Sequence, residues 1–292
     1  MQGPVAALLD GGARLHLQHG PIDLLITADA DPDARARAFH VARDRFASVL
    51  EELVAELPAL RAPMTAETPP PQGAVALRMH RATRPYTGVF VTRMAAVAGA
   101  VADEILAAMR AAAPLRRAFV NNGGDIALRL APGETCRGAM AGVTGADLGR
   151  VTVAASDGIG GIATSGSGGR SLSFGIADSV TVLARTAAGA DVAATLIANA
   201  VDLPAHPGIE RRPADQLHPD SDLGPRLVVT SVPRLSAEER RIALQAGSAR
   251  AQDWLAAGRI SGAALFLQGE QIVIGGQMTA ATREVLTQDA SG

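Results

Sequence analysis

The chain has 292 residues, 48% of them hydrophobic, which is enough to bury a core in one large domain or two small ones. The formal net charge is −2, so the chain has no basic surface field for a nucleic-acid backbone. All 27 basic residues are arginine, and the absence of lysine excludes Schiff-base chemistry and a phosphate loop ending in Gly-Lys-Ser/Thr. The single Cys136 excludes an internal disulfide and a thiolate metal site.

The N-terminal region predicts neither a signal peptide nor a membrane anchor. No basic residue precedes Arg14, and the apolar run at residues 5–9 is shorter than the roughly 7–15 residues that a signal peptide needs. No stretch reaches the roughly 18 apolar residues of a membrane span. We therefore expect a soluble protein of the cytoplasm, and the lone cysteine fits that reducing compartment.

The first part of the chain predicts two strands and a helix. Residues 14–27 alternate apolar and polar side chains on both sides of Gly20-Pro21, which indicates two strands or one bent strand. In residues 32–60 the apolar period changes to about 3.6, which predicts one long amphipathic helix that ends near Pro58. Residues 62–73 form a Pro-rich connection.

The remaining segments complete an α+β pattern. Two stretches rich in Ala and Gly, residues 94–109 and 191–201, predict thin helices that can pack closely on their neighbours. Short strand-like runs lie at residues 117–120, 126–130, 151–155, 172–176 and 180–184. After a polar loop at 206–224 come a strand at 227–232, a helix at 237–257 and a hairpin at 263–275 with its turn at Gly269-Glu270. We predict a single α+β domain over residues 1–292, with an antiparallel sheet that carries helices on one side.

The segment Asn121-Asn122-Gly123-Gly124-Asp125 lies between two of these strands. A tight hairpin that needs positive φ angles at Asn and Gly explains this composition by itself. In the alternative interpretation, the glycines let the main chain approach a ligand that hydrogen-bonds to Asn122 or Asp125.

Residues 158–171 combine six glycines with hydroxyl residues and one arginine. Successive backbone N–H groups in such a loop can surround an anion, and Thr164, Ser165 and Arg170 are further donors. A loop of this composition can also be simply flexible. The density of donors favours binding of a phosphate or pyrophosphate.

Asp191 and Thr195 are four residues apart, so on a helix their side chains face the same way. In one interpretation Asp191 caps the helix and Thr195 bonds back to a carbonyl. In the other, the two side chains hold a hard cation such as Mg²⁺, whose remaining ligands are phosphates and water.

Other polar residues give weaker indications. Asp220 and Asp222 lie two apart in a loop, which suits a solvated turn or a cation. His16 and His19 flank the end of a predicted strand, and no pair of histidines has the helical spacing of a metal site.

Four blocks, in order, resemble the ApbE family of FAD:protein FMN transferases. Residues 95–103 (AAVAGAVAD) resemble the family's A-x-x-K-G-x-x-x-D, with Ala98 in place of the lysine and Asp103 at the acidic position. Asn122-Gly123-Gly124 resembles its Asn-x-Gly-Gly turn. Residues 162–166 (IATSG) and 179–195 (SVTVLARTAAGADVAAT) resemble its Thr-Ser-Gly loop and its strand followed by A-D-x-x-x-T.

This resemblance implies an ApbE-like antiparallel sheet with packed helices, related to the T-fold, and a nucleotide site. In the transferases the equivalents of Asp191 and Thr195, with a main-chain carbonyl near Ala95, hold Mg²⁺ beside the FAD pyrophosphate. The implied cofactor-binding residues are Asn122, Gly123 and Gly124 at the flavin and Thr164, Ser165, Gly166 and Arg170 at the phosphates. No catalytic residue is assigned.

The chain also departs from the family. It lacks the lipoprotein signal, the lysine, and the aspartate-tyrosine and histidine-containing stretch that normally follow Thr-Ser-Gly. Its own runs, HGPIDL and PDSDLG among them, resemble instead an uncharacterised cytoplasmic branch of the superfamily. For that branch the resemblance predicts the fold better than it predicts the reaction, because the function depends on the residues of the site and not on the fold alone.

We therefore expect a protein that binds the small-molecule flavin nucleotides FAD or FMN with Mg²⁺ and has weak or altered FMN transfer to a protein acceptor. A first alternative is a non-enzymatic or accessory protein of a sulfur or redox pathway, whose pocket takes another anionic metabolite. A second is a different metal-assisted enzyme that uses Asp103, Asp220 and Asp222. The Ala-rich surfaces are compatible with a homo-oligomer.

Overall fold

A large antiparallel sheet forms the scaffold. The computed structural model describes residues 3–141, 145, 147–168 and 171–281, and within them nine strands form one sheet in the order β1-β2-β3-β4-β5-β8-β9-β12-β13. Its strands are β1 (Val5–Leu9), β2 (Arg14–His19), β3 (Ile22–Asp29), β4 (Arg117–Asn122), β5 (Asp125–Leu130), β8 (Gly161–Ser165), β9 (Ser179–Ala184), β12 (Gly262–Leu267) and β13 (Glu270–Ile274). Each strand runs antiparallel to its neighbours, so the predicted sheet type is confirmed.

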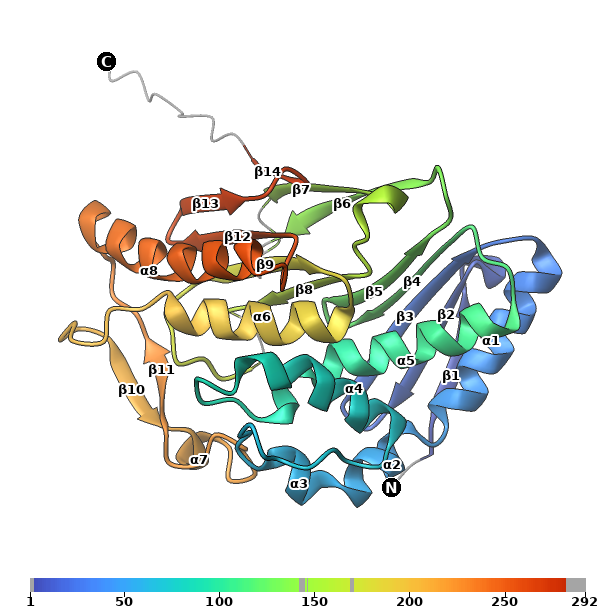
Figure 1. Cartoon of the computed structure of the whole chain (residues 1–292), viewed down its shortest axis with the longest axis horizontal. Coiled ribbons are helices and arrows are strands. Elements are labelled where there is room, and N and C mark those ends of the chain that lie inside the picture. The colour runs from blue at the N-terminus through green and yellow to red at the C-terminus, as the bar shows by residue number, and fades with distance from the viewer. Residues whose placement is uncertain (1–2, 142–144, 146, 169–170, 282–292) are drawn as a thin grey trace, which may run out of the picture.

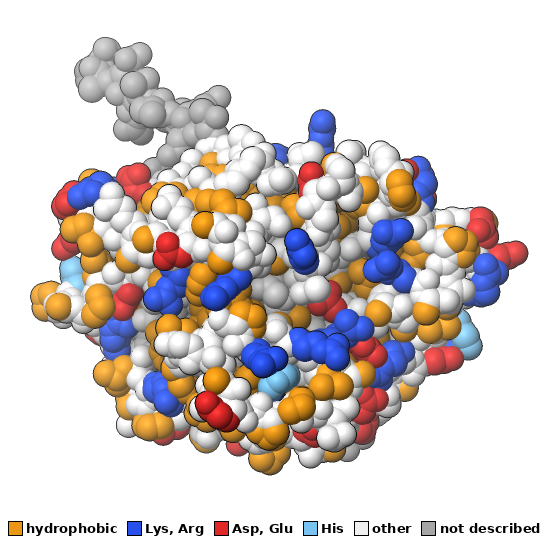
Figure 2. All heavy atoms as spheres, viewed as in Figure 1, with side chains coloured by type: hydrophobic (Ala, Val, Ile, Leu, Met, Phe, Trp, Pro, Cys, Tyr) orange, Lys and Arg blue, Asp and Glu red, His pale blue; other side chains and the backbone are white. Residues whose placement is uncertain are grey.

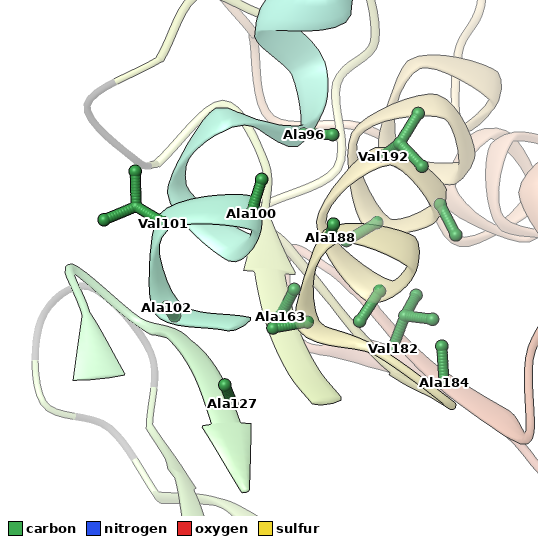
Figure 3. Packing of buried hydrophobic residues seen from close by; sticks show 14 of the residues in the cluster. Ala96, Ala100, Val101, Ala102, Ala127, Ala163, Val182, Ala184, Ala188 and Val192 are labelled. Atoms are coloured by element: carbon green, nitrogen blue, oxygen red, sulfur yellow. The ribbon is translucent and has the colours of Figure 1, made fainter. Parts of the chain in front are cut away.

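Helices cover one face of this sheet, as the sequence predicts (Figure 1). The helices α1 (Pro32–Phe46), α5 (Val97–Ala112), α6 (Ala187–Ala200) and α8 (Ala237–Ala256) lie side by side along it. Small side chains such as Ala100, Ala163 and Ala188 fill the space between α5, α6 and the strands (Figure 3). These side chains extend little beyond the backbone, so α5 and α6 approach each other closely, and the prediction of thin helices is confirmed.

The opposite face carries a second, smaller sheet that the sequence did not predict. It has the order β14-β7-β6, with β6 (Thr135–Ala141), β7 (Asp147–Ala154) and β14 (Met278–Ala280). Alternation along the strands explains the two cores: on β12, Leu265 joins the helix-side cluster, whereas Phe266 joins the cluster under the small sheet. Residues 151–155, expected in the main sheet, belong mostly to β7 of this second layer.

Residues 32–60 do not form the single helix that their periodicity predicts. They divide into α1, α2 (Val49–Ala55) and α3 (Leu57–Arg61). Pro58 lies in the first turn of α3, where its missing N–H is tolerated, but it cannot continue a helix from α2. At the first bend, the Arg45 guanidinium contacts Ser48 at 2.9 Å and Glu52 at 2.8 Å.

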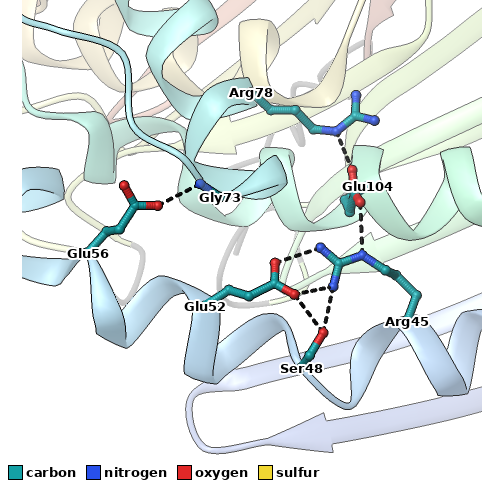
Figure 4. Close-up of polar contacts among 7 residues, drawn as sticks. All are labelled: Arg45, Ser48, Glu52, Glu56, Gly73, Arg78 and Glu104. Carbon is teal, nitrogen blue, oxygen red and sulfur yellow. Dashed lines mark hydrogen bonds and ion pairs between the residues drawn. The ribbon is translucent and has the colours of Figure 1, made fainter.

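An ion network fixes these bent helices against the core (Figure 4). Glu104 of α5 accepts hydrogen bonds from Arg45 at 2.9 Å and from Arg78 of α4 (Ala74–Thr83) at 2.7 Å. The Glu104 side chain is only 14% exposed, so these contacts are better shielded from solvent than a surface pair. Glu56 accepts the backbone N–H of Gly73 at 2.7 Å and so fastens the end of the Pro-rich connection to α2.

Two further expectations about local structure are wrong. Residues 172–176 are not a strand: the Asn199 side chain of α6 accepts the Phe174 N–H at 3.0 Å, and Gly175 packs against the Ala198 carbonyl. These contacts hold the segment against a helix end instead of a sheet. The β12–β13 turn falls at Gln268-Gly269, which have positive φ angles of 42° and 84°, one residue earlier than predicted.

The polar segment 206–224 contains structure of its own. The remaining elements are β10 (Glu210–Pro213) and α7 (Ala214–Leu217), followed by β11 (Leu227–Ser231), and the 3₁₀ turns η1 (Asp10–Gly12), η2 (Arg84–Tyr86), η3 (Arg93–Ala96) and η4 (Ala155–Asp157). The face shown in Figure 2 mixes arginine, acidic and hydrophobic side chains without a field of one sign. None of the helices in the described part of the chain has the length and apolar character needed to cross a membrane.

Candidate functional site

Two adjoining cavities bring together residues from distant parts of the chain. The first, here called the acidic cavity, has a volume of about 390 Å³ and is lined by Asp125, Asp191, Asp220 and Asp222. The second, here called the apolar cavity, has a volume of about 590 Å³, and its apolar lining includes several leucines of α2 and α3. The residues common to both linings are Met94, Val97, Ala98, Asp125 and Ser171.

All three residues predicted to hold a metal line the acidic cavity. Asp191 and Thr195 come from consecutive turns of α6, and Ala95 comes from η3. Asp191 and Thr195 therefore face the same way, as their spacing predicts. Among the residues that the structure describes, no three His, Cys, Asp or Glu side chains form a metal-binding group. The role of these three residues as metal ligands stays a prediction.

Asp191 carries a strongly perturbed carboxyl group in the acidic cavity. Its Oδ2 accepts the Gly99 N–H at 3.0 Å. Burial raises the pKa of Asp191 well above its usual value, and the nearby Asp125 carboxylate raises it further, against the lowering effect of the backbone N–H groups of Gly99 and Ala98. A buried negative charge beside a second carboxylate is stabilised by a cation.

Asp191 and Asp103 cap each other's helices. Asp191 of α6 accepts a backbone N–H at the start of α5, while Asp103 of α5 accepts the N–H groups of Ala187 and Ala188 at the start of α6, both at 3.0 Å. These donors belong to first helical turns, which have no partners within their own helix. The interpretation that Asp191 caps its own helix is wrong, because α6 begins four residues earlier and Thr186 is its N-cap.

Asp103 therefore stabilises the packing of α5 and α6 and is not part of the candidate site. It lines neither cavity, and its two carboxylate oxygens are bonded to α6. This removes one of the three carboxylates from the alternative of a metal-assisted enzyme. Gly99, in the same block, lies where a Cβ atom would be 2.3 Å from the Ala187 carbonyl oxygen, so part of the family-like block serves helix packing.

The Asn-Gly-Gly segment is the tight β4–β5 hairpin that its composition allows. Asn122 pairs with Asp125, and Gly123 and Gly124 have positive φ angles of 65° and 112°. The Asn122 side chain donates to the Ala98 carbonyl at 3.1 Å and so joins the hairpin to α5. Asn122 and Gly123 line the apolar cavity, whereas Gly124 lines neither cavity.

The predicted anion-binding loop is partly a strand. Residues 161–165 form β8 and pair with β9, so their backbone N–H groups do not make a continuous anion-binding turn. Thr164 bonds through its hydroxyl to Thr181 at 3.0 Å and through its N–H to Asp125 at 3.3 Å. Thr164, Ser165 and Gly166 line the apolar cavity. Arg170 lies outside the described residues.

A loop from the C-terminal half closes the acidic cavity. His218, Asp220 and Asp222 line it, and Asp222 accepts a hydrogen bond from the Thr92 hydroxyl, 130 residues away in sequence. The sequence identified the two aspartates but gave no signal for Thr92. His16 and His19 line neither cavity: His16 contacts Asp23 at 2.9 Å, and His19 is buried with Glu51 at 3.6 Å.

Sequence comparison identifies the family. A family model described as "AbpE bacteria" matches residues 6–278. This match spans most of the chain, so the chain belongs to this ApbE-like family, and the resemblance drawn from the four blocks is confirmed.

Individual relatives and solved structures are more distant. The UPF0280 protein MK0206 of Methanopyrus kandleri is 37% identical over 185 residues, which cover 61% of this chain and 69% of that protein. The UPF0280 protein MJ1526 of Methanocaldococcus jannaschii is 41% identical over 111 residues, covering 37% and 43%. The crystal structure of an ApbE protein from Thermotoga maritima aligns with a TM-score of 0.47 at 13% identity, covering 89% of this chain and 96% of that one. The flavin transferase ApbE from Vibrio cholerae aligns with a TM-score of 0.39 at 12% identity, covering 92% and 98%.

Proposed function

We propose that the chain binds a flavin nucleotide, FAD or FMN, together with Mg²⁺ across the two adjoining cavities. One observation carries this proposal. The residues that the resemblance assigns to the flavin and its phosphates mostly line the apolar cavity, and those assigned to the metal line the acidic cavity. The two cavities share the wall at Met94, Val97 and Ala98. Each volume falls within the roughly 300–1,000 Å³ of small-molecule sites.

The apolar cavity suits a flat ring with few polar atoms. Leu50, Leu53 and Leu57 remove one side of it from water, and Ser165 adds a hydroxyl group. Burial of a ring against such a surface favours binding, while a small number of polar groups fix its orientation.

The acidic cavity suits a phosphate only when a cation is also present. No arginine is found among the described residues that line it, whereas four aspartates are. Asp191, Thr195 and the Ala95 carbonyl are the oxygen donors that Mg²⁺ prefers, and a carboxylate that accepts one or two backbone N–H groups retains lone pairs for a metal. When bound there, Mg²⁺ would offset the negative charge of the phosphates.

The alanine at position 98 affects the proposed FMN transfer more than the proposed flavin binding. This residue lines both cavities, at the position where the resemblance places a lysine, and offers no positive charge. We infer that flavin binding is retained and that FMN transfer to a protein acceptor is weak. The same observation favours the second candidate, a non-enzymatic or accessory protein that holds an anionic metabolite.

The first test is a fluorescence titration of FAD in Mg²⁺ and in EDTA. We expect FAD to bind at least about tenfold more tightly with Mg²⁺, because coupling of this size is typical of two ligands that share a site. Riboflavin, which has no phosphate, is the control and should show no Mg²⁺ effect. Equal, weak binding of FAD in both buffers would contradict the proposed metal site.

A further inference from the structure

We propose that Arg61, in the wall of the apolar cavity, makes a phosphate contact in addition to the proposed Mg²⁺ site, and so selects phosphorylated flavins over riboflavin. The inference rests on the proposed function and adds a residue to which the resemblance gives no role. Arg61 is the last residue of α3, and its side chain is partly buried. It supplies the one arginine among the described residues that line either cavity.

The charge of Arg61 has no carboxylate partner within the described residues. None of their carboxylates forms an ion pair with it, although Asp125 lines the same cavity. Most of the apolar side chains in that lining are leucine and valine. A guanidinium offers five N–H donors in a planar fork that matches a phosphate. An arginine at the wall of an apolar cavity therefore favours a ligand with an apolar body and an anionic end.

The main chain on both sides of Arg61 is held in place. On one side, the buried Arg93 donates to the Ala59 carbonyl at 2.7 Å, and Leu60 is completely buried. On the other side, the Met64 N–H donates to the Val91 carbonyl at 2.8 Å.

These contacts tie Arg61 to the shared wall of the two cavities. Both Val91 and Arg93 lie in the segment that continues directly into Met94, Val97 and Ala98. The backbone of Arg61 is thus fixed relative to that wall before any ligand binds, which lowers the ordering cost of an arginine–phosphate contact. Arg61 approaches the site from α3, so it does not reproduce the position of a lysine at residue 98.

The test compares riboflavin, FMN and FAD in fluorescence titrations at one Mg²⁺ concentration. For Arg61→Gln we expect FMN and FAD to bind about tenfold or more weakly, because hydrogen bonds to a charged group are the stronger ones, and riboflavin to bind unchanged. Arg61→Lys should recover part of the loss. The affinity of the wild type for FMN should also fall more steeply with added salt than that of Arg61→Gln.

The matched control is Arg110→Gln, which removes an exposed arginine at the end of α5 that lines neither cavity. An equal loss for riboflavin and FMN in Arg61→Gln would overturn the inference, since the side chain would then act on the ring. Unchanged FMN binding would overturn it as well, because Arg61 would be a solvated surface residue. Failure of the wild type to bind any of the three ligands would instead contradict the proposed function itself.

Discussion

We expect Gly99→Ala to lower the free energy of unfolding by about 2–3 kcal/mol, although alanine is the better helix former by about 1 kcal/mol. A Cβ atom at Gly99 would lie 2.3 Å from the carbonyl oxygen of Ala187 and 2.6 Å from the nitrogen of Ala188. Both are backbone atoms, so relief requires that the first turn of α6 move. That turn is held by Asp103, and on its other side Gly161 of β8 leaves no room for a Cβ atom.

Urea denaturation of the wild type, Gly99→Ala and Gly88→Ala measures this effect. Gly88 is the control, because a Cβ atom there would meet no atom within 4 Å and its φ angle is ordinary. If Gly99→Ala were as stable as the wild type, or more stable, α5 and α6 would not approach as closely as described. Such a result would also remove the packing explanation for the glycine of this family-like block.

Transfer of FMN from FAD to an acceptor peptide is expected to be about 10²–10³-fold slower than in a lysine-containing ApbE protein, the usual cost of losing one preorganised charge contact. Ala98 lines both cavities and has no charge to offer. No lysine exists elsewhere in the chain to replace it. Arg61 enters from another element, and its planar fork does not reproduce an ammonium group at residue 98.

Mass spectrometry of the acceptor peptide after incubation with FAD and Mg²⁺ decides this point. Ala98→Lys is the informative variant, since it adds the charge to the wall shared by both cavities, and transfer should increase in it. A wild type that adds FMN as fast as the lysine-containing protein run in parallel would contradict the expectation and favour a full transferase.

Local patterns predicted the elements that have strong periodicity or distinctive turns. The Ala-rich α5 and α6, the β2–β3 pair at Gly20-Pro21 and the Asn-Gly-Gly hairpin are all present. The spacing of Asp191 and Thr195 also predicted correctly that they share one face, because helix geometry alone determines it.

Features that depend on distant contacts were not predictable in this way. The bends between α1, α2 and α3 depend on Glu104 and Arg78 as well as on Pro58. Within the glycine-rich run 158–171, β8 is a strand because β5 and β9 flank it. The contact between Thr92 and Asp222 joins residues that share no local pattern. Reciprocal capping by Asp103 and Asp191 likewise appears only when the two helices are packed together.

We propose that metal and flavin nucleotide occupy one connected site. The most direct test is whether Asp191→Asn removes the effect of Mg²⁺ on the affinity for FAD. The asparagine oxygen can still accept the Gly99 N–H, and a neutral side chain suits a position where burial raises the pKa of Asp191, so the fold should be kept. The measurement is the ratio of the FAD dissociation constants in EDTA and in Mg²⁺. We expect this ratio to fall from about ten or more in the wild type to about one in Asp191→Asn. An unchanged ratio in a folded Asp191→Asn protein would contradict the account.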